Sequence, residues 1–115
     1  MDKALKRSVG ALLAYIIKTD GRDVRKEAPL FCRMMGEDFE CDDQEALDLL
    51  ETLMHSEYDL EAEAERIAEA LQNDKLSKYH LLEQLNHMIY SDTITPDDYK
   101  LFERIKQRLF PDEEG

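Results

Sequence analysis

The chain has 115 residues, of which 43% are hydrophobic and 37% charged, so it is long enough for one small domain around a single core. No long apolar run is present, which excludes a membrane-spanning segment. The formal net charge of −12 at pH 7 disfavours binding to the phosphates of a nucleic acid, because like charges repel.

The apolar residues of the N-terminal third recur with the 3.6-residue period of an α-helix. This stripe predicts a helix over residues 3–19, which residues 20–21 (Asp-Gly) end. A second helix follows, and either Val24 or Arg25 is expected to be its N-cap. That start would place Pro29 among the first positions, whose amides lack an intrahelical partner, so the proline would cost no hydrogen bond.

Four further helices are predicted in the remaining chain, each opened by a polar residue. Their N-caps are expected at Asp42, Asp59, Ser77 and Thr95. In the first of these helices, Leu47 belongs to the apolar stripe that should face the core. The fold class is therefore predicted to be all-α, a compact bundle of about six to seven helices.

Charge is distributed unevenly along the chain. Residues 1–36 carry a local charge of +4, residues 37–74 carry −14, and residues 75–115 carry −2. A run of like charge is most often the solvated face of a helix. The alternative is that residues 37–74 form an acidic surface that attracts a basic partner, which would raise the association rate without choosing the partner.

Two short segments of the chain resemble each other. Residues 16–21 and residues 88–93 both run from an apolar helix end through a hydroxyl residue and an Asp into a short turn. In each copy an acidic residue follows in the first turn of the next helix, Glu27 in the first and Asp98 in the second. The similarity predicts a duplicated helix-turn-helix unit.

With this pattern the sequence resembles the TerB-like family of tellurite-resistance and stress-associated proteins, a domain also found ahead of the J-domain in some membrane-anchored co-chaperones. The family pattern is an apolar helix ending in Ala-Asp-Gly, then a β-branched residue and a helix that opens with Glu, and it occurs twice. Residues 20–21 with Glu27 match the first copy, and residues 91–98 correspond to the second.

The match departs from the family pattern in both copies. Thr19 replaces the common Ala and Asp23 occupies the usual β-branched position, while the second copy lacks the glycine and ends in Asp98 instead of Glu. The resemblance covers nearly the whole chain in helix order. It implies a compact all-helical fold with two pseudo-twofold-related halves, in a bacterial stress-response protein.

The two acidic turns form the candidate metal site. In a pseudo-twofold arrangement they would place Asp20, Glu27, Asp92 and Asp98 within reach of one site. Carboxylate oxygens suit Ca²⁺, Mg²⁺ or Mn²⁺. The alternative is that all four residues only cap helices and stabilise turns.

The sequence gives little support for catalysis, zinc binding or cysteine chemistry. The sequence has no G-x-S-x-G, P-loop, dinucleotide-binding or kinase signature, so no catalytic residue is predicted. His55, His80 and His87 do not form a zinc motif. Cys32 and Cys41 lack C-x-x-C spacing, and together with the absence of a signal peptide they favour a cytoplasmic protein.

The predicted function is a non-enzymatic TerB-like stress-response and tellurite-resistance-associated module, a protein-interaction domain with a divalent-cation site at its acidic turns. The alternative is an acidic decoy or adaptor that binds a basic partner through residues 37–74 without metal. Residues 1–110 are expected to form the domain and residues 111–115 a frayed acidic tail. A monomer or homodimer with a protein partner is expected, without nucleic acid or membrane insertion.

Overall fold

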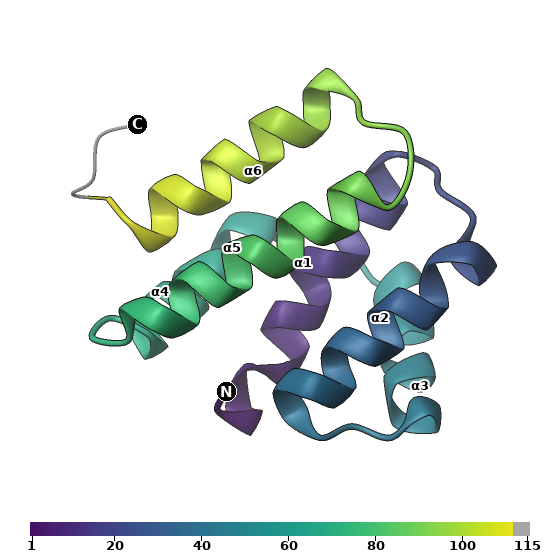
Figure 1. Ribbon diagram of the computed structural model, residues 1–115, viewed down its shortest axis with the longest axis horizontal. Helices are drawn as coiled ribbons and strands as arrows, with labels where there is room; N and C mark the ends of the chain where they lie inside the picture. Colours follow the sequence, from purple (N-terminus) through teal and green to yellow (C-terminus); the bar gives the residue numbers. More distant parts are fainter. Residues whose placement is uncertain (112–115) are drawn as a thin grey trace.

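Six α-helices and one short 3₁₀-helix make up residues 1–111, the part of the chain that the computed structural model describes (Figure 1). In chain order they are η1 (Lys3–Leu5), α1 (Lys6–Thr19), α2 (Val24–Phe39), α3 (Asp43–Met54), α4 (Leu60–Ala70), α5 (Lys75–Tyr90) and α6 (Pro96–Leu109). These residues contain no strand, which confirms the predicted all-α class. Of the predicted frayed tail, residues 112–115 lie outside the described residues.

Helix starts follow from side chains that accept hydrogen bonds from first-turn amides. The predicted N-caps Asp42, Asp59 and Thr95 are confirmed, because each accepts such a bond. The predicted start of α5 is wrong. Its N-cap is Asp74, whose carboxylate accepts from both the amide and the hydroxyl of Ser77, so the helix begins three residues earlier.

Helix α2 also begins earlier than predicted. Its N-cap is Asp23, whose carboxylate accepts a bond from the Arg25 amide at 3.0 Å. Pro29 is therefore the sixth residue of the helix, beyond the four positions that lack an intrahelical partner. The expectation that Pro29 costs no hydrogen bond is wrong, since the carbonyl of Arg25 loses its usual donor.

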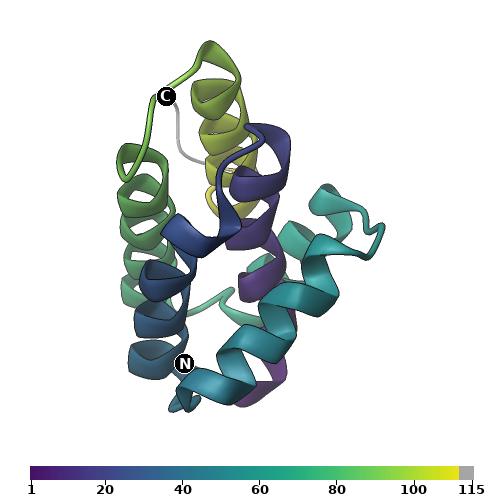
Figure 2. The same ribbon diagram turned by 90° about the vertical axis from the view of Figure 1, so that its right-hand side faces the viewer.

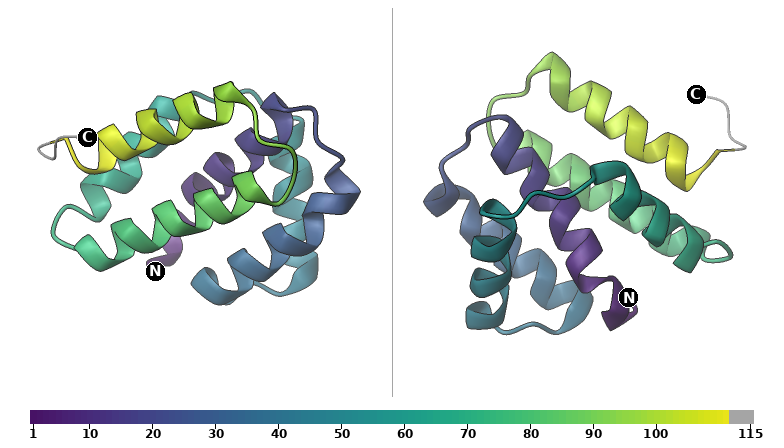
Figure 3. Two further views of the ribbon diagram at one scale, coloured as in Figure 1. Left: turned by 45° about the horizontal axis from the view of Figure 1, so that its top comes forward. Right: turned by 180° about the vertical axis from the view of Figure 1, so that it is seen from behind.

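Helix α1 lies at the centre of the bundle. It contacts α2, α3, α4 and α5, and Figures 2 and 3 show it (purple) passing between them. Residues 8–14 and 16–17 are all buried. A helix that is apolar on nearly every side must be covered by other helices, so this segment determines where the core lies. None of the helices in the described residues is both long and apolar enough to cross a membrane.

Gly10 lets α3 approach α1 closely. A Cβ atom at this position would lie 3.1 Å from Leu49 Cδ2 and 3.3 Å from Leu53 Cδ1. Both distances are shorter than most contacts of real Cβ atoms. Position 10 therefore requires a small residue because of the packing distance and not because of an unusual backbone angle.

The connection between α3 and α4 is held onto α1 by two polar side chains. Lys18 Nζ donates to the carbonyls of Leu53 and Ser56 at 3.3 and 2.6 Å. The Tyr58 hydroxyl donates to the carbonyl of Ala11 at 2.9 Å, and burial raises the pKa of Tyr58 to about 12. These three bonds join the α3–α4 connection to α1.

Candidate functional site

The two acidic turns meet at one end of the bundle, as the near-repeat predicts. Figure 1 shows the α1–α2 turn next to the α5–α6 turn. Between them lies the Arg22 side chain, which is only 2% exposed. Its guanidinium donates to the carbonyls of Met88, Ile89 and Thr93 at 2.6, 2.9 and 3.5 Å. Arg22 therefore caps the C-terminal end of α5 with a positive charge.

Arg22 also contacts two of the four predicted carboxylates. Asp20 Oδ2 lies 3.1 Å and Asp98 Oδ2 lies 3.6 Å from the same guanidinium nitrogen. Asp98 accepts a bond from the Thr95 amide at 2.9 Å as part of a capping box. The Thr95 hydroxyl donates to Asp20 at 3.4 Å, so the N-terminus of α6 is connected to the end of α1.

In this cluster the carboxyl groups outnumber the one cation, Arg22. Burial raises the pKa of Asp20, hydrogen bonding and repulsion from Asp98 raise it further, and Arg22 opposes the shift. A third carboxylate, Glu27, is 2% exposed and accepts a bond from the Ser91 hydroxyl at 2.7 Å. The other oxygen of Glu27 is buried without a partner among the described residues. Two of these carboxyl groups therefore share the Arg22 guanidinium directly, and Glu27 is connected to it through the Ser91 hydroxyl.

Asp92, the fourth predicted ligand, is not part of the cluster around Arg22. Its carboxylate accepts a bond from the Thr93 amide at 2.7 Å, and this bond lowers the pKa of Asp92. Its observed contact is thus the turn-stabilising one. Within residues 1–111 no group of three or more His, Cys, Asp and Glu side chains is arranged to hold a metal ion. The predicted carboxylates do not form one ligand set, because the Arg22 guanidinium lies among them.

The acidic segment 37–74 is largely neutralised by neighbours. Three of its carboxylates cap helices: Asp42, Asp59 and Asp74. Six more have a basic side chain within ion-pair distance: Glu37, Asp38, Glu45, Glu61, Glu63 and Glu65. Most of this segment therefore matches the expectation of a solvated helix surface.

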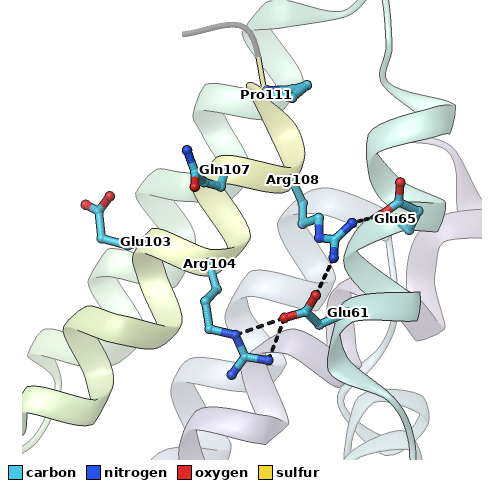
Figure 4. A pocket seen from close by; sticks show the side chains of 7 residues that line it. All are labelled: Glu61, Glu65, Glu103, Arg104, Gln107, Arg108 and Pro111. Atoms are coloured by element: carbon cyan, nitrogen blue, oxygen red, sulfur yellow. Dashed lines mark hydrogen bonds and ion pairs between the residues drawn. The ribbon is translucent and has the colours of Figure 1, made fainter. Parts of the chain in front are cut away.

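An open hollow of about 680 Å³ lies between α4 and α6 (Figure 4). Arg104 donates to one oxygen of Glu61 at 2.7 and 3.0 Å, and Arg108 donates to the other oxygen. Arg108 also donates to Glu65 at 2.8 Å. Figure 4 shows Glu61 between the two guanidinium groups, so both arginines are already occupied by carboxylates of the protein. The ion pairs that line the hollow are best explained as links that hold α4 and α6 together.

The outward face of α3 is different. Asp43, Leu47 and Glu51 are spaced four residues apart, which places them on one stripe of the helix. Neither carboxylate of this stripe has an ion-pair partner among the described residues, and the neighbouring Asp48 is bonded only to Gln44. Leu47 is 41% exposed, so its predicted place in the core is wrong. We call Asp43, Leu47, Asp48 and Glu51 the α3 face.

Comparison with models of known protein families gives a match over most of the chain. The sequence model of a family described as "Tellurite resistance protein TerB" matches residues 6–109, from the start of α1 to the end of α6. The curated proteins gave no match, and neither did the solved structures.

Proposed function

Because the chain belongs to the TerB family of tellurite resistance proteins, we propose that it is a tellurite-resistance-associated module that acts as a non-enzymatic protein-interaction domain. The observation that carries this proposal is the α3 face. There an exposed leucine lies between carboxylates that have no cationic partner among residues 1–111. A single exposed leucine is common on protein surfaces, so the proposal depends on the unpaired carboxylates beside it, which would attract a basic partner.

The chemistry of the α3 face supports a basic protein as the partner. Lysine or arginine side chains would pair with the carboxylates of Asp43, Asp48 and Glu51, and an apolar side chain would cover Leu47. The opposite side of α3 packs against α1 and α2, so the helix is held in place before the partner arrives. Steering by unpaired charge is screened by salt, so association with this partner should weaken as ionic strength rises.

Removal of the α3 charges should weaken the interaction without unfolding the protein. We expect Asp43→Asn/Asp48→Asn/Glu51→Gln to weaken binding to basic proteins captured from the host cell by about tenfold, at about 0.5 kcal/mol per exposed charge. The same variant should lower the tellurite tolerance that the wild-type chain restores to cells lacking it. Capture at low and high salt and growth on tellurite are the measurements.

A matched control removes three exposed carboxylates elsewhere. Glu57→Gln/Glu69→Gln/Glu83→Gln changes the net charge equally but leaves the α3 face intact. This control should keep both capture and tolerance. Equal losses in the two variants would show that only net charge matters, and no loss in either would disprove the role of the α3 face.

Divalent-cation binding at the two turns is the second hypothesis, and the unpartnered oxygen of Glu27 is the observation that favours it. The Arg22 guanidinium already lies between Asp20 and Asp98, however, and like charges repel. We therefore expect calorimetric titration with Ca²⁺, Mg²⁺ or Mn²⁺ to show no saturable heat. Saturable binding that Asp20→Asn/Asp92→Asn removes would contradict this expectation and restore a metal role.

A further inference from the structure

A small pocket lies between the end of α5 and the start of α6, next to the turn that joins these helices in Figure 1. Its volume is about 130 Å³. Three aromatic side chains line it, Tyr90 from α5 and Tyr99 with Phe102 from α6. The pocket is therefore built from rings on two helices that the bundle holds together.

The two tyrosines are unusually open to solvent for aromatic residues. Tyr90 is 55% and Tyr99 58% exposed, while Phe102 is half-buried against the core. Hydrogen bonding with Tyr99 raises the pKa of Tyr90. Because of their exposure, both tyrosine rings are accessible to a ligand in solution.

The pocket lining also contains acidic residues. Two acidic residues, the buried Asp98 and the exposed Glu103, are among the residues that line the pocket. No lysine or arginine is among its lining residues. Arg22 contacts Asp98 at 3.6 Å but does not itself line the pocket. The lining thus combines aromatic rings with carboxyl groups and offers no positive charge.

We propose that this pocket binds an alkylammonium cation, such as the trimethylammonium group of a small quaternary amine or of a methylated lysine. Aromatic rings attract such cations through the negative face of their π-systems, and a nearby carboxylate adds to the attraction. The volume is well below that of pockets for drug-sized ligands, which suits a single cationic group. The pocket lies on α5 and α6, so the proposal does not depend on the α3 face.

The test compares choline with its neutral isostere, 3,3-dimethyl-1-butanol, at constant ionic strength. We expect choline to cause saturable NMR shifts of the Tyr90 and Tyr99 ring protons, and the neutral alcohol to cause none. Tyr99→Leu should weaken choline binding roughly fivefold to thirtyfold, whereas Tyr99→Phe, which keeps the ring, should retain it. Equal responses to both compounds, or no saturable response to millimolar choline, would overturn the proposal.

Tyr79→Leu is the matched control, because Tyr79 is also exposed but packs on Phe110 away from the pocket. It should leave choline binding unchanged, and a loss equal to that of Tyr99→Leu would also overturn the proposal. A peptide with trimethyllysine, compared with the same peptide carrying unmodified lysine, separates the two sources of the cation. Tighter binding of the methylated peptide than of choline would assign the pocket to a modified protein, and the reverse order to a small molecule.

Discussion

Replacement of Arg22 by methionine is expected to lower the free energy of unfolding by about 3–5 kcal/mol. The substitution keeps the apolar length of the side chain but removes the charge and its donors. The carbonyls of Met88 and Ile89 would lose their bonds to the guanidinium, and the carboxyl groups of Asp20 and Asp98 would remain buried without a cation. Chemical denaturation at pH 7 measures the loss.

The pH dependence separates this effect from a simple loss of packing. Without Arg22, the pKa of Asp20, which burial already raises, should rise further, because Arg22 is the group that opposes this shift. Asp20 then binds a proton more readily in the folded than in the unfolded state, so the stability of Arg22→Met should recover as the pH falls through the folded pKa of Asp20 toward its unfolded value. Arg25→Met, at an exposed site on α2, is the control and should change stability by less than about 0.5 kcal/mol. A similarly small change for Arg22→Met would refute the assigned role of this residue.

Replacement of Gly10 by leucine is expected to destabilise the protein by about 2–3 kcal/mol. The new side chain would have to occupy the space filled by Leu49 and Leu53, whose methyl groups lie 3.1 and 3.3 Å from the position of a Cβ atom. Phe31 Cζ lies 3.5 Å from the same Cβ position, so no free space remains beside it. The leucine side chain could therefore be accommodated only if α3 moved away from α1. Thermal or chemical unfolding gives the measurement.

Gly10→Ala is the reference variant for this prediction. An alanine gains about 1 kcal/mol of helix propensity over glycine. It would also press on the ends of two flexible leucine side chains, so we expect a net change near zero. If Gly10→Leu were no less stable than Gly10→Ala, the close approach of α1 and α3 would not depend on the glycine.

Much of the fold could be predicted because it depends on short-range patterns. The period of the apolar residues and the N-cap residues located the helices. The predicted helix start was wrong where two neighbouring residues could both serve as N-cap. At the start of α5, Asp74 is a stronger hydrogen-bond acceptor than the hydroxyl of Ser77 and begins the helix earlier. Leu47 was misplaced for a related reason, since period alone does not show how wide the buried stripe of α3 is.

The candidate site was predictable only in part. The near-repeat correctly predicts that the two turns meet, and it brings Asp20, Glu27 and Asp98 to the same cluster. It could not predict that Arg22 fills the cluster, because an arginine beside a turn is equally able to point into solvent. One signal was present in the sequence, since Arg22 is a basic residue that directly follows the Asp-Gly turn and has acidic residues on both sides.

The position of Arg22 has a consequence for the order of folding. Its bonds to Met88 and Ile89 join residues 66 and 67 positions apart in the chain. Closing so long a loop costs entropy before the contacts can repay it, so these bonds should form after the rate-limiting barrier has been crossed. A substitution at Arg22 should then mainly speed unfolding and leave the folding rate nearly unchanged. The bonds of Arg22 to the end of α5 therefore help to set the lifetime of the folded protein.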